Sequence, residues 1–101
     1  MRLLLSVEFP IEPFNTLVRE GSIGHTLSAI LEEIKPEAAY FTERDGKRGG
    51  IFIVDLTGPS DVPKFAEPFF LKLNAECKFH IAMTPQDLAK AGLEGIGKKW
   101  G

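Results

Sequence analysis

Polar side chains suited to chemistry recur at alternating positions of segments that have the pattern of β-strands. These residues are Ser6, Glu8, Tyr40, Thr42, Asp55, Lys78 and His80. A histidine next to a carboxylate can act as a general base, because imidazole titrates near neutral pH and the carboxylate orients the ring. We therefore predict that His80 is a candidate catalytic base, with Glu8 or Asp55 as the residue that orients it. The alternative is that both carboxylates lie in solvent and that His80 is an ordinary interface residue.

Metal, cofactor and thiol chemistry have less support in the sequence. The two histidines, His25 and His80, and the single cysteine, Cys77, do not have the spacing of a zinc site, so we expect no metal. We also expect no cofactor, because the glycines of residues 45–50 belong to a turn and not to a strand-to-helix phosphate loop. A lone cysteine forms no disulfide within its chain, and we expect Cys77 to be a buried, unreactive thiol.

A predicted β-hairpin over residues 38–56 would position several of the polar side chains. Two apolar runs flank a polar stretch in which Asp45-Gly46 is the expected two-residue turn, so that Tyr40 lies opposite Ile51. One face of the hairpin would carry Ala39, Phe41, Phe52, Val54 and Leu56, and the other would carry Tyr40, Thr42, Ile51, Ile53 and Asp55. Both faces are largely apolar, so we expect the sheet to be covered on both sides.

Hydrophobic periodicity predicts the remaining elements of the chain. They are strands over residues 2–9 and 76–83 and helices over residues 11–20, 23–35, 61–73 and 84–91. Ser22 and either Ser60 or Asp61 are the expected N-cap residues of the second and third helices. Thr84 opens the last helix with a predicted capping box. Pro68 lies inside the third helix, where we expect a kink.

The predicted architecture is a single α+β domain over residues 1–101, with the order β-α-β-β-α-β and an extra C-terminal helix. Right-handed crossovers place the helices that connect successive strands on the same face of the sheet. This is the ferredoxin-like arrangement, a four-stranded antiparallel sheet in the order 4-1-3-2. Its helix-free face would expose a group of apolar side chains that includes Leu4, Tyr40, Ile51 and Ile53.

A contiguous apolar patch on a protein surface usually marks an interface. Burial of one large apolar side chain contributes about 1.5–3 kcal/mol, a large share of the roughly 5–10 kcal/mol of net stability of such a domain. We therefore expect a homodimer in which two sheet faces meet around a pocket. The residues expected to bind a ligand there are Ser6, Tyr40, Thr42, Ile51, Ile53 and Lys78. The alternative is that the C-terminal helix and Trp100 cover the sheet face of their own chain.

Charge and hydropathy restrict the class of partner. The chain has 12 basic and 14 acidic residues, so we expect no nucleic-acid partner, because such proteins usually carry a basic patch. No apolar stretch approaches the ~20 residues that cross a bilayer, so we expect no membrane span. Glu8 and Pro10 interrupt the short apolar run at the start, MRLLLSV, and no small-residue cleavage site follows it. We therefore expect no signal peptide and a cytoplasmic location.

Three stretches carry a resemblance that extends over nearly the whole chain. They are Lys35–Gly49 (KPEAAYFTERDGKRG), Pro59–Ala75 (PSDVPKFAEPFFLKLNA) and Met83–Ala91 (MTPQDLAKA). On these motifs the chain resembles a small bacterial family of uncharacterised proteins in the dimeric α/β-barrel superfamily. That superfamily includes muconolactone-isomerase-like enzymes and cofactor-free monooxygenases. The resemblance implies a homodimer of ferredoxin-like subunits with a cavity for a small apolar or aromatic ligand.

Three functions are compatible with these observations. The first is a homodimeric domain that binds a small molecule on the helix-free face. The second is a cofactor-free isomerase or monooxygenase-like enzyme with His80 as its base, which requires His80 and a carboxylate to lie within hydrogen-bond reach. The third is a structural or interaction dimer with a dry interface and no cavity.

Overall fold

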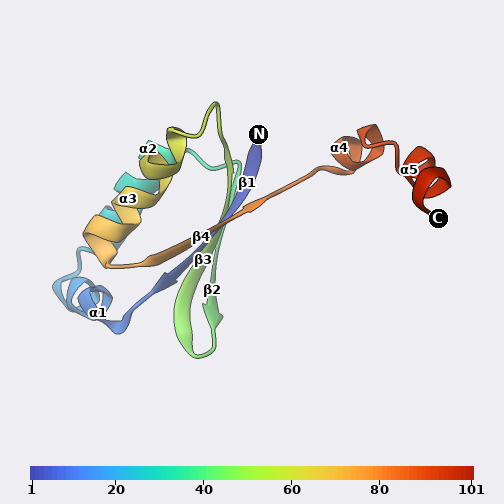
Figure 1. Cartoon of the computed structure of the whole chain (residues 1–101). Coiled ribbons are helices and arrows are strands. Elements are labelled where there is room, and N and C mark those ends of the chain that lie inside the picture. The colour runs from blue at the N-terminus through green and yellow to red at the C-terminus, as the bar shows by residue number, and fades with distance from the viewer.

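The computed structural model describes residues 1–101 and shows an α+β fold with a four-stranded antiparallel sheet and five helices (Figure 1). The strands are β1 (Arg2–Phe9), β2 (Ala38–Arg44), β3 (Lys47–Asp55) and β4 (Glu76–Ile81). The helices are α1 (Ile11–Glu20), α2 (Ile23–Ile34), α3 (Asp61–Leu73), α4 (Pro85–Lys90) and α5 (Leu93–Trp100). Helices α1, α2 and α3 lie on one side of the sheet, and β4 leads away from them to α4 and α5 (Figure 1).

The sheet has the strand order β2-β3-β1-β4, with every neighbouring pair antiparallel. Read from the β4 edge, this order is 4-1-3-2, so β1 lies between β3 and β4 while β2 and β4 form the edges. In the register, Leu5 of β1 lies between Phe52 of β3 and Phe79 of β4. Because successive side chains of a strand point to opposite faces, these three residues share the helix-covered face.

The hairpin between β2 and β3 closes through the turn predicted from the sequence. Asp45 and Gly46 have φ angles of 52° and 80°, the left-handed region that this two-residue turn requires. The Glu43 carboxylate accepts a hydrogen bond of 2.8 Å from the Gly46 N–H and stabilises the turn. Tyr40 lies opposite Ile51, which confirms the predicted register and the two sets of residues on its faces.

The core lies between the sheet and the layer formed by α1, α2 and α3. Its largest fully buried side chains are Phe9, Phe52, Phe69, Leu5, Leu73 and Val54. Phenylalanine rings form a continuous row through this core in the order Phe14, Phe9, Phe69, Phe52 and Phe41, with centroids 5.2–6.1 Å apart. Rings at this separation attract one another beyond the gain from burial alone. The row connects α1, through α3, to the edge strand β2.

Two helix starts differ from the sequence-based expectation. Neither Ser22 nor Ser60 makes a side-chain hydrogen bond that caps its helix. Asp61 does not cap α3 either, because its carboxylate accepts hydrogen bonds of 2.8 Å from both the N–H and the hydroxyl of Thr57 in the preceding loop. Helix α3 contains Pro68 and continues as a single helix on both sides of it.

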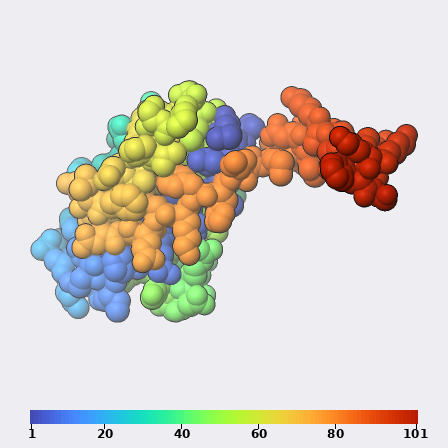
Figure 2. All heavy atoms as spheres, in the orientation of Figure 1, coloured from blue at the N-terminus to red at the C-terminus, as the bar shows by residue number.

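The C-terminal segment, residues 82–101, is called the arm below, because it extends away from the rest of the chain (Figures 1 and 2). Helix α4 starts at the predicted capping box, in which the Thr84 hydroxyl and the Asp87 carboxylate each accept a hydrogen bond of 3.0 Å from the other residue's N–H. The residues after Gly92, for which no helix was predicted, form α5. All residues of α4 and α5 are exposed.

The overall dimensions show how far the arm extends. The chain measures 59 × 29 × 18 Å, and its radius of gyration is 17.0 Å. A compact domain of about 100 residues has a radius of gyration of about 13 Å. The arm therefore does not fold back, and the alternative in which the C-terminal helix and Trp100 cover the sheet face of their own chain is not the arrangement in the structure. The helix-free face of the sheet is left without any covering element of its own chain.

Candidate ligand-binding site

The helix-free face of the sheet combines an apolar region with a polar end. The register aligns its residues in rows across the strands. The first row contains Ala38, Ile53, Leu4 and His80, and the second contains Tyr40, Ile51, Ser6 and Lys78. The third row, nearer the hairpin turn, contains Thr42, Gly49, Glu8 and Glu76. We call Leu4, Tyr40, Ile51 and Ile53 the apolar strip.

A polar cavity of about 120 Å³, called the Ser6 pocket below, lies beside the apolar strip. Its lining residues are Ser6, Glu8, Arg44, Asp45, Glu76 and Lys78. Ser6 is 7% exposed, and it is the one polar side chain among the buried residues of the chain. Its hydroxyl accepts a hydrogen bond from the Arg44 guanidinium, with 2.8 Å between Nη1 and Oγ. The guanidinium has five N–H donors in total, so Arg44 can bind a ligand while it holds Ser6.

Gly49 leaves room for Arg44 to reach Ser6. Arg44 pairs with Lys47 at the hairpin end, whereas Ser6 lies opposite Ile51, four residues further along β3. The guanidinium must therefore extend diagonally past position 49, which is on the same face of the sheet. A glycine at that position has no side chain that would stand between the two residues.

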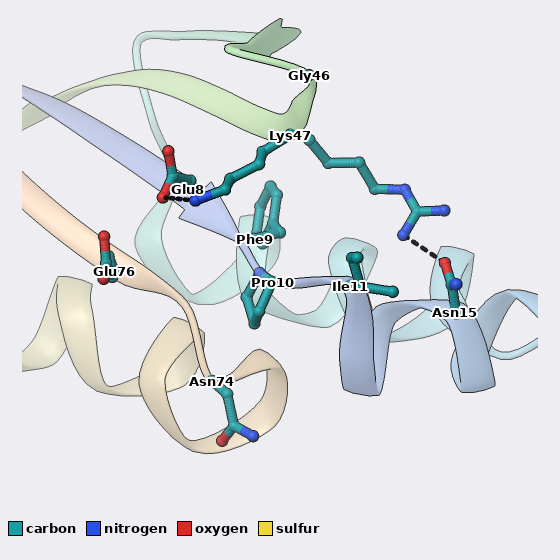
Figure 3. Close-up of a pocket in the computed structure, with 10 residues that line it drawn as sticks. Glu8, Phe9, Pro10, Ile11, Asn15, Gly46, Lys47, Asn74 and Glu76 are labelled. Carbon is teal, nitrogen blue, oxygen red and sulfur yellow. Dashed lines mark hydrogen bonds and ion pairs between the residues drawn. The ribbon is translucent and has the colours of Figure 1, made fainter.

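A larger cleft of about 620 Å³ adjoins the Ser6 pocket, and Glu8 and Glu76 line both. Figure 3 shows it between the end of β1, the hairpin turn and the start of α1. The Lys47 ammonium lies 3.6 Å from the Glu8 carboxylate, and Arg48 donates a hydrogen bond of 2.7 Å to the Asn15 side-chain oxygen (Figure 3). Glu76 has no ion-pair partner, so its carboxylate is free to accept hydrogen bonds from a molecule in either cavity.

The apolar strip supplies the other half of the site. Leu4, Ile51 and Ile53 are half-buried by their neighbours in the sheet, and Tyr40 is 67% exposed. Ligand sites typically combine an apolar surface with a few polar groups that fix the orientation of the ligand. A molecule with an apolar or aromatic body could lie on the strip and place a polar end at Arg44 and Ser6.

Glu8 and His80, two of the three predicted catalytic residues, do not meet within one subunit. The register places Glu8 opposite Glu76, whereas His80 lies opposite Leu4, four residues away along β1. Four residues of a strand span about 13 Å at roughly 3.3 Å per residue. That separation is far outside hydrogen-bond reach, so Glu8 does not orient His80.

Asp55, the third predicted catalytic residue, has a different partner. Its carboxylate accepts a hydrogen bond of 3.0 Å from the terminal ammonium group of Met1 and lies opposite Arg2 in the register. His80 makes no side-chain hydrogen bond or ion pair. The predicted arrangement of a histidine base with an orienting carboxylate is therefore not formed within the subunit.

The predicted ligand-binding residues do lie on one face, and the structure divides them between its two halves. Ser6 and Lys78 line the Ser6 pocket, whereas Tyr40, Ile51 and Ile53 belong to the apolar strip. Thr42 shares the face at the polar end, where its hydroxyl donates a hydrogen bond of 3.3 Å to the neighbouring backbone carbonyl.

Sequence reasoning missed three residues of the Ser6 pocket, namely Arg44, Asp45 and Glu76. The alternation along β2 contained a signal for Arg44, because Tyr40, Thr42 and Arg44 are separated by two residues each and must share a face. Charged residues at the tip of a hairpin are commonly solvated, so residue type alone was no reason to predict that Arg44 lines a pocket. Nothing in the sequence indicated that its side chain reaches β1.

The single thiol lies outside the site. Cys77 is on the helix-covered face of β4, where burial and, to a smaller extent, the negative charge of Glu67 raise its pKa to about 11. The thiol is therefore protonated at neutral pH and is a poor nucleophile. The chain has no group of three or more histidine, cysteine, aspartate and glutamate side chains arranged to hold a metal ion. None of its helices combines the length and the hydropathy needed to cross a membrane.

Comparison with known proteins adds no assignment to this geometry. No protein-family model matches the chain, and no curated protein matches it significantly.

Proposed function

We propose that the protein is a homodimeric small-molecule-binding domain with its ligand on the helix-free face of the sheet. In this proposal the subunit is ferredoxin-like, two subunits form a dimeric α/β barrel, and the chain belongs to the bacterial family that its motifs resemble. The protein acts in the cytoplasm. The ligand has an apolar or aromatic body and one polar end.

The observation that carries the proposal is the Arg44–Ser6 contact next to the apolar strip. A serine in the middle of a central strand is costly to bury unless its hydroxyl is hydrogen-bonded, and the guanidinium of Arg44 supplies that bond at 2.8 Å. The same contact fixes Arg44 in the site, with N–H donors to spare for a ligand. A charged donor that is already held in place loses less conformational entropy when the ligand binds.

A second subunit is part of the proposal because the apolar strip has no cover of its own. Full burial of a large apolar side chain contributes roughly 1.5–3 kcal/mol to stability. While the four side chains of the strip stay in contact with water, the subunit lacks a substantial part of that contribution for each of them. A twofold dimer that brings two such faces together buries them and encloses the ligand at once.

Catalysis is the weaker proposal for this face. An isomerase or a cofactor-free monooxygenase with His80 as base needs a group that orients the imidazole, and neither Glu8 nor Asp55 lies beside it in the subunit. A binding role requires only the apolar strip and the polar pocket, both of which one subunit supplies.

Ligand-observed NMR tests the proposal. We expect saturation transfer from the protein to 2-naphthoate, which joins an aromatic body to a carboxylate, and a weaker transfer to naphthalene-2-carboxamide, which lacks the charge. Arg44→Gln should weaken 2-naphthoate binding, whereas Arg19→Gln, at an exposed position of α1, should leave it unchanged. A dimer to which neither compound binds, or equal binding by both variants, would contradict the proposed site and favour the structural dimer.

A further inference from the structure

The arm carries large apolar side chains that remain exposed to solvent in their own subunit. The exposed fractions are 44% for Leu88, 55% for Leu93, 47% for Ile96 and 77% for Trp100. Leu93, Ile96 and Trp100 are spaced by three and four residues, so they lie on one side of α5. A groove between α4 and α5, lined in part by Leu88 and Leu93, adds to this apolar surface.

The two helices of the arm are too short to persist without a partner surface. Helix α4 has six residues and α5 has eight, whereas isolated helices shorter than about 12–15 residues are marginal in water. Gly95 and Gly97 lower the helix propensity of α5 further. The capping box at Thr84 stabilises only the start of α4. Packing against another surface must therefore supply the stability that the arm lacks.

That surface does not belong to the arm's own subunit. The last backbone hydrogen bond between the arm and the sheet runs from the Ala82 N–H to the Arg2 carbonyl, at 3.1 Å. Beyond it the chain continues away from the sheet, on the side opposite α1, α2 and α3 (Figures 1 and 2). The arm thus extends beyond the sheet, and all residues of α4 and α5 remain exposed.

The sheet face that carries the apolar strip matches the arm in size. Helix α5 is about 12 Å long at 1.5 Å per residue, and four strands spaced by about 4.8 Å span roughly 14 Å. One α5 can therefore cross the width of the sheet. The arm has three lysines and two acidic residues, whereas the rest of the chain has nine basic and twelve acidic residues, so the two parts of the chain have net charges of opposite sign.

We propose that two copies of this chain exchange arms, so that α4 and α5 of each copy cover the apolar strip of the other. The exchange is reciprocal about a twofold axis, which closes the assembly at two subunits. The inference rests on the proposed function and deepens it, because it names the element that covers the ligand. Leu93, Ile96 and Trp100 of one copy would then form the lid over the ligand that is held by Arg44 of the other.

Trp100 reports on this contact without any modification, because it is the only tryptophan in the chain. We expect its emission to shift to shorter wavelength and to become less accessible to acrylamide as protein concentration rises. The apparent mass from size-exclusion chromatography with light scattering should change from one to two chains over the same concentration range.

Variants on the two surfaces test whether they meet. Leu93→Glu on the arm and Ile53→Glu on the apolar strip should each give a monomer with exposed Trp100. Val18→Glu is the matched control, because Val18 is an exposed aliphatic residue of α1, 47% accessible, and should leave both readouts unchanged. Leu93→Glu cannot act by unfolding the sheet, since the arm does not pack on it; circular dichroism verifies the fold of Ile53→Glu.

The remaining outcomes separate the arm exchange from the proposed function. A dimer with Trp100 exposed at all concentrations would overturn the arm exchange and leave the homodimer intact. Protection of Trp100 in a monomer would show that the arm covers its own subunit, which also overturns the exchange. A monomer with exposed Trp100 at all concentrations overturns both the exchange and the homodimer, whereas ligand binding is decided independently by the NMR experiment.

Discussion

The two faces of the sheet alternate along the same strands, yet they differ in how completely they are buried. On the helix-covered face, Leu5 and Phe52 are 0% exposed. On the other face, the adjacent residues Leu4 and Ile53 are only half-buried, although they are equally apolar. The difference is thus one of cover and not of composition. The helices of the subunit bury the apolar residues on one face of the sheet, whereas burial of the apolar residues on the other face requires a partner.

Truncation of adjacent residues on β3 should give the largest contrast between the two faces. Phe52→Ala should lower the free energy of unfolding by about 3–5 kcal/mol, because it opens a cavity in the core. Ile53→Ala should cost about 1 kcal/mol in dilute protein, because the side chain is only partly buried. Urea denaturation at low concentration measures both. Equal losses would show that the helix-free face is already covered within one subunit.

Thiol reactivity reports on the covered face at the β4 edge. Burial raises the pKa of Cys77 to about 11 from an ordinary value of 9.0, so at pH 8 its thiolate fraction is about 100-fold lower than that of an ordinary thiol. Iodoacetamide labelling followed by mass spectrometry should therefore be about 100-fold slower than in urea-unfolded protein, and its rate should rise with pH toward 11. Rapid labelling at pH 8 would show that this side of β4 opens to solvent.

Gly50 on the covered face should not tolerate a methyl group. A Cβ at this position would lie 2.7 Å from ring atoms of Phe52, which is buried and has no room to move. Gly50→Ala should lower the free energy of unfolding by about 1–3 kcal/mol through overpacking. Gly24→Ala is the control: nothing lies within 4 Å of its added Cβ in α2, so we expect a small gain in stability. Loss of stability in the control would indicate a general intolerance of alanine.

The smallest expected effect concerns the arm, which we propose as the cover of the second face. Hydrogen bonds from the Thr84 N–H and hydroxyl lower the pKa of Asp87 below its ordinary value of 3.8. A lowered carboxyl pKa stabilises the folded arrangement above the ordinary value, and this contribution is lost as the pH falls through the lowered one. Amide chemical shifts of α4 should therefore lose helical character only below about pH 3.8. Thr84→Ala should reduce the shift in the pKa of Asp87 without abolishing it, because the substitution removes the hydroxyl and keeps the backbone N–H. An Asp87 that titrates at its ordinary pKa would contradict the capping box.

Local patterns were sufficient to predict most of the sheet. The Asp45-Gly46 turn fixed the hairpin register, and alternation along each strand then assigned every residue to a face. The capping box at Thr84 was equally readable, because both of its partners lie within four residues. The predicted serine caps are not formed: Ser22 and Ser60 have suitable residue types, but both have right-handed helical backbone angles in place of the extended conformation typical of a capping residue.

Features that depend on distant contacts could not be predicted in the same way. The Arg44–Ser6 hydrogen bond joins residues 38 positions apart, on strands that are not neighbours in the sheet. Three glycines lower the helix propensity of the last nine residues, so the sequence did not predict α5. The helix forms nevertheless, because intrinsic propensity is only a weak guide to structure. The separation of Glu8, Asp55 and His80 follows from the register along β1, in which Glu8 lies opposite Glu76, His80 opposite Leu4 and Asp55 opposite Arg2.

The position of β2 at the sheet edge has a consequence for how the protein behaves when concentrated. Six of its seven residues are exposed, and the AAYF segment offers unpaired backbone groups together with the half-exposed Phe41 ring. Such an edge can recruit further strands into open-ended fibrils. Glu43 and Arg44 place charges at the end of this strand and oppose stacking of identical chains. Neutral apolar substitutions at these two positions would thus favour fibril growth even where the folded subunit retains its stability.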